Sequence, residues 1–528
     1  MTLVWLILIP FIGGLLSWLG EHRVGVGFPR WVALISMLLA LGISLWVWAT
    51  GDWSLAGVGT DTPRWVLEYR AEWIPRLGIS VHLGMDGLSL LLVVLTNLLG
   101  VMAVVCSWKE IEKNVGFFHL NLLWNLGGVV GVFLTLDLFL FFFLWEMMLV
   151  PMYFLIALWG HNSPGGKGRI YAATKFFIFT QASGLIMLLA ILGLVFVHQQ
   201  QTGVITFNYM DLLQTDMSYG VEYLLMLGFF IAFAVKTPVV PFHSWLPDAH
   251  SQAPTAGSVD LAGILLKTAA YGMLRFALPL FPNASADFAP FAMWLGVVGI
   301  LYGAFMCFSQ NDIKRLVAYS SISHMGFVLI GIYAGTEIAL QGVVMQMLAH
   351  GISAGALFIL CGEIYERLHT REMSKMGGLW ARLPYLPPIA LFFAVAALGL
   401  PGLGNFVGEF LILLGSFEQA TLVTCIAATG LVLGAVYSLI LVQRAFHGTP
   451  RADMPQLKDL SKRELTMMGA LMAILLWLGL YPQPVLDTSA ASMRGVSAIY
   501  QQAQQSRAAP VLAEGEALPA AAAAEVLP

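Results

Sequence analysis

The chain has 528 residues, of which 59% are hydrophobic and 11% charged, and its formal net charge is −4. A typical soluble domain carries about 25% charged residues, so this composition excludes an ordinary soluble protein and indicates one that contacts the lipid bilayer. The near-zero net charge argues against nucleic acid as a partner.

The sequence lacks the marks of a metal or redox site. Its four cysteines, Cys106, Cys307, Cys361 and Cys425, are scattered singly in apolar runs. No Cys/His metal spacing and no haem-attachment motif is present, and no glycine-rich dinucleotide fingerprint follows a strand. We therefore expect no cofactor-binding or metal-ligating residues in this chain.

A helix that crosses a bilayer needs about 20 mostly apolar residues, and the chain contains fourteen such runs. They lie near residues 3–19, 31–50, 87–107, 116–134, 136–159, 172–197, 222–246, 255–278, 288–308, 316–334, 338–365, 387–416, 420–446 and 465–484. The first run has no basic segment and no small-residue cleavage site, so we expect a retained span rather than a signal peptide. The sequence therefore predicts an all-α polytopic membrane protein with about fourteen transmembrane helices.

The basic residues between these runs sort strongly to one side. With alternate loops placed on opposite sides, 18 of the 26 lysines and arginines fall on one side and six on the other. The six are Arg64, Arg70, Arg76, Arg275, Arg494 and Arg507. The positive-inside rule makes the richer side cytoplasmic, which predicts that both termini lie outside the cytoplasm. The other two cations, Lys236 and Lys267, lie inside apolar runs.

Two of the runs contain signals that break a helix. In the seventh run, Lys236 is followed by two prolines within five residues, and each lacks an N–H and clashes with the carbonyl four residues earlier. These prolines are expected to release the carbonyls of Ala234 and Thr237, as in the broken transporter helices that line ion sites. The twelfth run carries a second break at 400–405, Leu-Pro-Gly-Leu-Gly-Asn.

The matching positions of the two breaks predict two five-helix units, spans 4 to 8 and spans 9 to 13. An odd-sized unit that is repeated once returns inverted in the membrane, as in many transporters. The expected domains are 1–110 for three spans and an outer loop, 111–280 and 281–450 for the two repeats, 451–490 for the last span, and 491–528 for a tail that is disordered at its end. Within the outer loop, residues 65–69 and 79–83 alternate weakly and predict a small β-hairpin.

Several ionisable residues lie deep inside the apolar runs. They are Glu146 in the fifth run, Lys267 in the eighth, His324 in the tenth, His350 in the eleventh and Glu409 after the break in the twelfth. A charge at the bilayer centre costs at least about 2.5–3.5 kcal/mol, so these groups are expected to pair or to contact water. Lys267 is the only lysine in its span, and we expect a helix without a break around it.

Each of these residues has a structural alternative. Ion pairs can merely hold spans together, interhelical hydrogen bonds can satisfy the histidines, and His243 and His250 can cap the loop at the break. Asp260 shares a helix face with Lys267 but is expected near the membrane edge, in a structural role. Because charges kept within the membrane are usually functional, a proton relay through the buried acids and lysines is the stronger interpretation.

Two stretches carry a resemblance to a known family. The first is Lys236-Thr-Pro-Val-Val-Pro-Phe-His-Ser-Trp-Leu-Pro-Asp-Ala-His-Ser-Gln-Ala-Pro-Thr255, followed by Ser258-Val-Asp-Leu-Ala-Gly-Ile-Leu-Leu-Lys267. The second is Asn311-Asp-Ile-Lys-Arg-Leu-Val-Ala-Tyr-Ser-Ser-Ile-Ser-His-Met-Gly326. Both closely resemble the antiporter-like subunits of proton-pumping NADH:quinone oxidoreductase, respiratory complex I, and the fourteen spans with a hairpin-like loop fit its subunit M. The resemblance covers roughly residues 1–490.

The resemblance implies proton translocation that is driven by redox chemistry in other subunits. The residues that it implies as proton carriers are Glu146, Lys236, Lys267, His324, His350 and Glu409. Glu146 would pair with Lys236, and Glu409 would be the outlet. NADH, FMN, iron–sulfur clusters and quinone would bind partner subunits, and the partners would include other antiporter-like membrane subunits.

Two other functions fit part of these observations. A subunit of a multisubunit Na⁺/H⁺ antiporter would use the same buried acids and lysines, but the length of the chain and the block at 311–326 favour the complex I subunit. A structural anchor for a redox arm would not explain why two lysines are kept at membrane depth.

Overall fold

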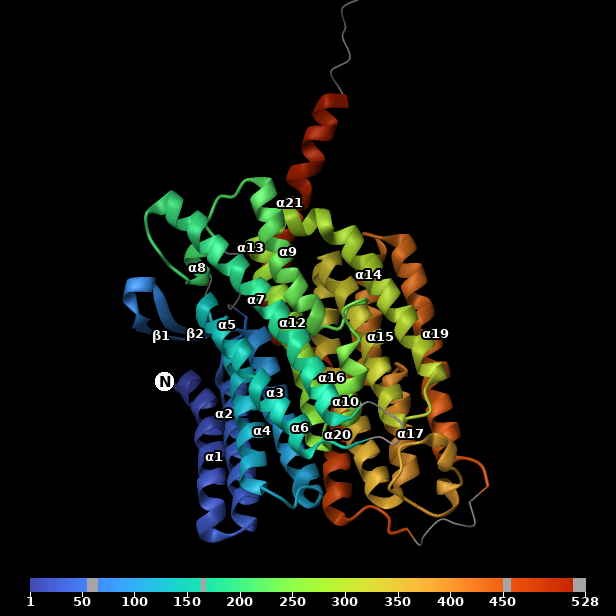
Figure 1. Cartoon of the computed structure of the whole chain (residues 1–528). Coiled ribbons are helices and arrows are strands. Elements are labelled where there is room, and N and C mark those ends of the chain that lie inside the picture. Colours follow the sequence, from blue (N-terminus) through green and yellow to red (C-terminus); the bar gives the residue numbers. More distant parts are fainter. Residues whose placement is uncertain (55–64, 163–167, 450–456, 516–528) are drawn as a thin grey trace, which may run out of the picture.

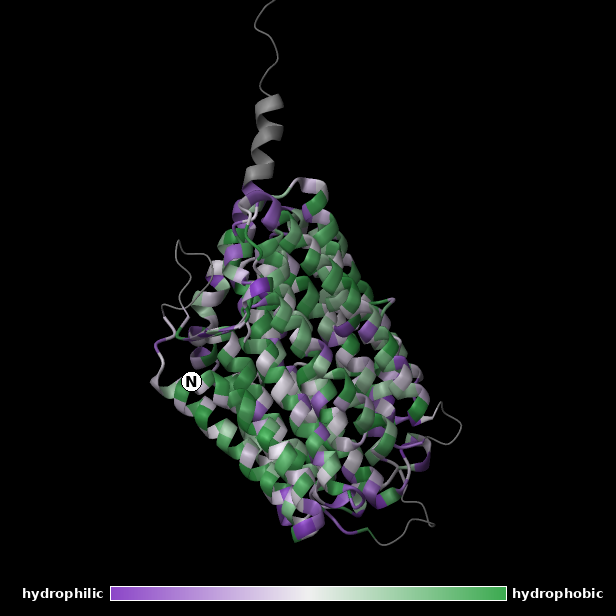
Figure 2. Ribbon diagram, turned by 60° about the vertical axis from the view of Figure 1, so that its left-hand side comes forward, coloured by the Kyte–Doolittle hydropathy of each residue, from purple (hydrophilic) through white to green (hydrophobic). Residues whose placement is uncertain are grey.

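The computed structural model describes residues 1–54, 65–162, 168–449 and 457–515, with side chains as far as residue 505. Within these ranges the molecule is a bundle of long helices that run side by side (Figure 1). Apolar residues dominate the middle of the bundle, and hydrophilic residues gather toward its two ends (Figure 2). A bundle that crosses a bilayer needs this distribution, because the hydrocarbon core offers no hydrogen-bond partners.

All fourteen predicted spans are present among the described residues. Thirteen helical runs are long and apolar enough to cross a membrane, and two shorter apolar helices occupy the remaining run. The first half of the chain forms α1 (Thr2–Val24), α2 (Gly27–Thr50), α3 (Gly87–Glu110), α4 (Val115–Leu134), α5 (Leu138–Met147), α6 (Leu149–Trp159), α7 (Arg169–Thr202), α8 (Tyr209–Leu212), α9 (Tyr219–Lys236) and α10 (Trp245–Gln252). The second half forms α11 (Thr255–Asp260), α12 (Leu266–Gly272), α13 (Leu278–Leu280), α14 (Pro282–Ser309), α15 (Ile313–Ala334), α16 (Glu337–Leu368), α17 (Leu386–Ala397), α18 (Gly404–Phe417), α19 (Thr421–Phe446), α20 (Lys462–Leu480) and α21 (Gln483–Gly515).

A small sheet marks one end of the bundle, which we call the hairpin end. Strand β1 (Leu67–Ile74) pairs antiparallel with β2 (Ile79–Met85), which confirms the predicted hairpin. A short 3₁₀ helix, η1 (Pro75–Leu77), connects them, and Gly78 follows it with a left-handed φ of 66° that favours glycine. An isolated bridge from Leu83 to Thr135 joins the hairpin to the bundle.

The opposite end, which we call the basic end, gathers the loops that carry most of the lysines and arginines. Arg30 donates to the carbonyl of Ile111 at 2.9 Å, and Arg371 pairs with Asp312 at 3.3 Å. Two 3₁₀ helices, η4 (Met373–Lys375) and η5 (Leu379–Ala381), lie in the longest of these loops. Three residues used in the sorting, Arg64, Lys167 and Arg451, lie outside the described residues, as does the side chain of Arg507.

Both predicted helix breaks are confirmed. α9 ends at Lys236, and the chain turns through 237–244 before α10 begins, while residues 398–403 separate α17 from α18. The prediction that the carbonyl of Ala234 is released was wrong, because the N–H of Val239 in the turn donates to it at 2.9 Å. The sequence did not predict a third interruption, at Met148 between α5 and α6.

The eighth span is continuous, as expected, but it is not a regular α-helix. Two π-helical segments, η2 (Leu261–Leu265) and η3 (Met273–Ala277), flank α12 on either side. Lys267 is the second residue of α12, so a widened turn precedes it directly. π turns are rare inside α-helices and often mark functional sites.

The tail is helical over most of its length, where the sequence predicted no helix. α21 extends from Gln483 to Gly515, so the expected boundary at residue 490 falls inside it, and residues 516–528 lie outside the described residues. The Ser492 hydroxyl donates to Asp86 at 2.8 Å, and the Tyr500 hydroxyl donates to the carbonyl of Tyr333 at 3.0 Å. α21 therefore packs against both halves of the chain. The inverted relation of the two five-helix units stays a prediction.

Candidate functional site

One group of buried charges surrounds the break after α9. Lys236 is 1% exposed, and its Nζ lies 3.7 Å from the ring centre of Trp145. The ring quadrupole attracts a cation placed over its face, so the indole replaces part of the lost hydration. Glu146 follows Trp145 on α5, and its carboxylate and the Lys236 ammonium attract each other. The ammonium has no hydrogen-bond partner in the described part of the chain, so the two groups are neighbours without direct contact.

Asp260 joins this first group. It is the last residue of α11 and is fully buried, and its carboxylate accepts a hydrogen bond from the side-chain amide of Asn125 on α4. The Asp260 charge also acts on Lys236. The sequence placed this carboxylate near the membrane edge in a structural role, whereas the structure buries it beside the break.

A second group begins at Lys267. This lysine is fully buried, and its Nζ donates to the carbonyl of Ala262 in the π segment η2. The same Nζ lies 2.8 Å from Nδ1 of His350 on α16. The described ion pairs include no carboxylate at Lys267, so its neighbours are a carbonyl and an imidazole.

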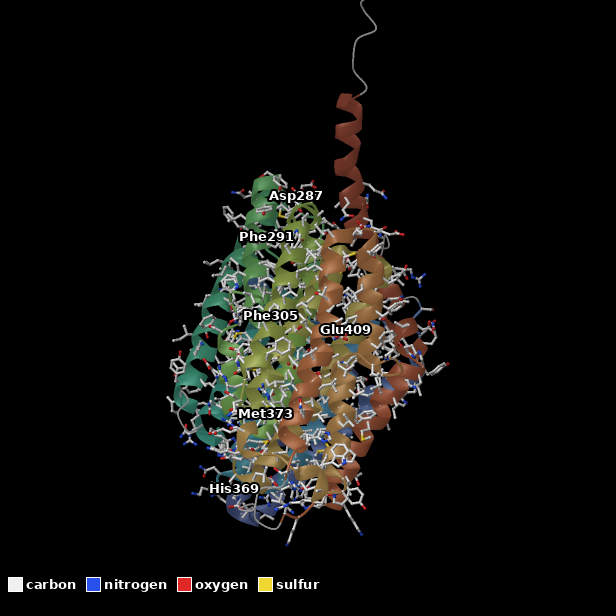
Figure 3. The ribbon with its side chains drawn as sticks, turned by 90° about the vertical axis from the view of Figure 1, so that its right-hand side faces the viewer. Asp287, Phe291, Phe305, His369, Met373 and Glu409 are labelled. Carbon is white, nitrogen blue, oxygen red and sulfur yellow. The ribbon has the colours of Figure 1, made fainter. Side chains whose placement is uncertain are left out.

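The line continues from His350 to Glu409. The rings of His350 and His324 have their centres 5.2 Å apart, and Nδ1 of His324 lies 2.7 Å from Oε1 of Glu409. Gln346 donates to the same carboxylate oxygen at 2.9 Å, and the hydroxyl of Tyr437 lies 3.3 Å from Nε2 of His324. Glu409 lies near mid-height of the bundle, between the labelled Asp287 toward one end and His369 toward the other (Figure 3).

The structure therefore brings four of the six predicted site residues together. Lys267, His350, His324 and Glu409 come from α12, α16, α15 and α18, and each lies next to the following one. Glu146 and Lys236 belong to the first group, and no described hydrogen bond joins that group to Lys267. The histidine at the break, His250, is fully buried with its ring stacked on Phe358 at 5.0 Å.

Sequence reasoning missed several polar partners of these groups. Asn125 and Gln346 are amides inside apolar spans, and Gln346 precedes His350 by one helical turn, which is a usable signal. Arg275 was sorted among the outer loops, but it lies 1% exposed in η3 and forms an ion pair with Asp86. The phenol of Tyr437 gave no signal, because a lone tyrosine in an apolar span usually packs like any other aromatic residue.

One cluster of carboxylates has the spacing of a metal site. Ligand oxygens of Glu363, Glu366 and Glu464 lie within 4.8 Å of one another at the basic end. Arg367 pairs with Glu363 at 2.6 Å and with Glu464 at 2.9 Å. A guanidinium already compensates two of the three charges, so we interpret this cluster as an ion-pair network.

The second group is suited to passing a proton between neighbours. A neutral imidazole accepts a proton on one nitrogen and releases one from the other, and two such rings lie between an amine and a carboxylate. The groups come from four helices at the interior of the bundle, away from lipid. The chemistry open to such an arrangement is proton exchange along the line, which makes and breaks no bond between heavier atoms.

Comparison with known proteins agrees with this architecture. Residues 135–434 match the family model described as NADH:quinone oxidoreductase/Mrp antiporter, TM. NADH-quinone oxidoreductase subunit M of Pseudomonas aeruginosa is 69% identical over 497 residues, which cover 94% of this chain and 97% of that protein.

Two solved structures have the same fold. A chain of respiratory complex I from Thermus thermophilus with bound NADH gives a TM-score of 0.82 at 30% identity, covering 96% of this chain and 99% of that one. A chain of the Mrp complex from Dietzia sp. DQ12-45-1b gives a TM-score of 0.81 at 20% identity, covering 96% and 98%, and at this identity the likeness concerns the fold alone. The resemblance first seen in two stretches of the sequence is thus confirmed over nearly the whole chain. The chain belongs to the family of NADH-quinone oxidoreductase subunit M.

Proposed function

We propose that this chain is the proton-translocating membrane subunit M of an NADH:quinone oxidoreductase. The observation that carries the proposal is the line from Lys267 through His350 and His324 to Glu409. Ionisable groups at membrane depth are costly and usually functional, and each member of this line can take up and release a proton. A line of this kind in a chain that matches 97% of the length of a subunit M supports proton translocation over a purely structural role.

The proposed path has two stages. Glu146 takes up a proton and exchanges it with Lys236, with water between them because the two groups do not touch. The charge of Asp260 adds to the negative potential at Lys236. The proton then moves to Lys267 and along the imidazoles to Glu409, from which it leaves.

The energy for this transport comes from partner subunits. NADH, FMN, iron–sulfur clusters and quinone bind elsewhere in the complex, and the immediate neighbours of this chain include other antiporter-like membrane subunits. Each five-helix unit, 111–280 and 281–450, holds one half of the proton path. A helix break in the second-last span of each unit supports this assignment.

We further propose that both termini lie on the periplasmic side of the inner membrane. The basic end carries most of the lysines and arginines, and cytoplasmic loops are rich in these residues. Alkaline phosphatase fused after residue 505 should therefore be active and a cytoplasmic reporter at the same position silent. The opposite pattern would overturn the proposed topology, and a fusion in the loop before α15 is the matched control with the reverse expectation.

The function is tested by purifying the complex through a tag on this chain. Flavin and iron–sulfur subunits are expected to copurify, and proteoliposomes that contain the complex should form a ΔpH on addition of NADH, without Na⁺. If neither the flavin subunit nor the iron–sulfur subunits copurify, and protons are exchanged only when Na⁺ is present, the chain is instead a subunit of a multisubunit Na⁺/H⁺ antiporter. The fold alone does not separate these functions, since the Mrp chain shares it.

A further inference from the structure

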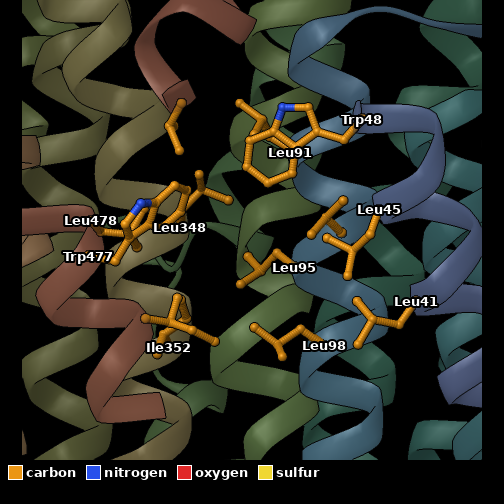
Figure 4. A pocket seen from close by; sticks show the side chains of 13 residues that line it. Leu41, Leu45, Trp48, Leu91, Leu95, Leu98, Leu348, Ile352, Trp477 and Leu478 are labelled. Carbon is orange, nitrogen blue, oxygen red and sulfur yellow. The ribbon is translucent and has the colours of Figure 1, made fainter. Parts of the chain in front are cut away.

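A wholly apolar pocket lies between the first helices and the last ones. It has a volume of about 190 Å³ and no polar lining, and α2, α3, α16, α20 and the start of α21 surround it. Figure 4 shows its side chains facing one another across the gap, with Leu41, Leu45 and Trp48 on one side and Trp477 and Leu478 on the other. None of the buried acids, lysines or histidines of the candidate site takes part.

The pocket has a closed inner wall and an open mouth. Leu95 and Ile352 at the back are each 3% exposed, whereas Leu45 and Trp477 at the front are 44% and 37% exposed. The mouth opens on the side of the bundle, between spans that cross the bilayer. It therefore faces lipid rather than water.

The pocket covers about one leaflet at the hairpin end. Trp48 lies two residues from the end of α2, and Leu98 lies eleven residues into α3. At about 1.5 Å per residue, the pocket extends from roughly 3 Å to roughly 16 Å below the hairpin end, which is about half of a hydrocarbon core of ~30 Å. Trp48 and Trp477 approach with ring centres 6.3 Å apart near the membrane surface, where tryptophan is enriched.

Size and polarity restrict what fills this pocket. Water needs polar partners in a cavity, and the lining offers none, since the Trp48 N–H already donates to Thr488 at 2.9 Å. A space of about 190 Å³ between five helices suits a slender apolar group better than a whole helix about 10 Å wide. An unbranched hydrocarbon chain that runs along the bilayer normal meets both conditions.

We infer that this pocket binds one acyl chain of a phospholipid from the leaflet at the hairpin end. The acyl chain lies between α2 and α20 and fills the gap that separates the N-terminal three spans from the last one. The side chains that line an empty pocket lack dispersion contacts on one side. The acyl chain supplies these contacts and so stabilises the packing of the two helices. The headgroup stays at the surface beside the two tryptophans.

A photoreactive side chain at the mouth tests the occupant directly. A benzophenone amino acid replaces Leu45, and the intact complex is illuminated after thorough exchange into detergent. The adduct expected on this chain has the mass of a phospholipid. The matched control carries the same group at Leu39, which is 53% exposed on α2 but does not line the pocket, and several-fold less phospholipid adduct is expected there. Equal labelling at both positions, or a crosslink from position 45 to another subunit, overturns the inference.

A bulky substitution gives a second measurement. Leu45→Trp closes the mouth, so the purified complex should retain one phospholipid fewer than wild type in native mass spectrometry. Leu39→Trp adds the same side chain to the same helix away from the pocket and should retain the wild-type number. The same phospholipid count in Leu45→Trp as in wild type contradicts the assignment, whatever the activity of the variant.

Discussion

Lys267→Arg is expected to reduce proton pumping nearly as far as Lys267→Ala, while the complex still assembles. A structural lysine needs only its charge, and an arginine supplies that charge and can still donate to the carbonyl of Ala262. A relay lysine must release its proton to His350. An arginine with a pKa above about 12 does so only at a cost of roughly 7 kcal/mol at pH 7. The measurement is ΔpH formation in proteoliposomes, with NADH-to-artificial-acceptor activity as the assembly control.

The matched control for this substitution is Lys175→Arg. Lys175 lies on α7 and pairs with Asp248 at 2.8 Å, so it needs charge and reach but no proton release. This variant is expected to pump like wild type. If Lys267→Arg also pumps like wild type, Lys267 is a structural charge and the proposed line does not begin there.

Glu146→Ala is expected to lower coupled turnover by roughly 50-fold or more. The substitution removes both the group that exchanges protons with Lys236 and the negative charge that offsets the burial of its ammonium. An uncompensated charge at membrane depth costs at least about 2.5 kcal/mol, and every 1.36 kcal/mol is tenfold in rate. The rate of ΔpH formation, normalised to assembled complex, is the quantity to measure.

Glu146→Asp separates the two parts of that effect. It keeps the carboxylate on a shorter stem, and because Glu146 and Lys236 do not touch, the water proposed to bridge them would absorb the change in length. Turnover between those of wild type and Glu146→Ala is expected. Proton uptake in Glu146→Ala that matches wild type would refute a role for this carboxylate in the path.

The parts of the fold that could be predicted from sequence are those that the bilayer itself imposes. A span needs a long apolar run whatever its neighbours are, and a proline ends α9 after Lys236 because of its own ring. The π segments around Lys267 carry no such local mark, since widening of a turn depends on packing against other helices. α21 was missed because its apolar residues are few, although Tyr500 and Met493 among them are fully buried.

The candidate site divides in the same way. The linear sequence alone identifies an ionisable residue in an apolar run, which is how we found Glu146, Lys236, Lys267 and Glu409. Their partners were not, since Asn125 meets Asp260 and Gln346 meets Glu409 only after spans distant in the chain have packed. The expected contact between Glu146 and Lys236 is replaced by the ring of Trp145, which no spacing rule indicates.

The position of α21 in the chain has a consequence for the timing of biosynthesis. Asp86 accepts a hydrogen bond from the hydroxyl of Ser492, which lies 406 residues later in the sequence. Trp48 donates a hydrogen bond to Thr488, which lies 440 residues later. At about 5–20 residues per second, the ribosome reaches Ser492 roughly 20 to 80 s after Asp86 has been made. All fourteen spans are therefore synthesised before the hairpin end can close. Until α21 has packed, the newly inserted protein exposes a surface at its hairpin end that the folded protein covers. A chaperone or a membrane protease can distinguish the two states by this surface.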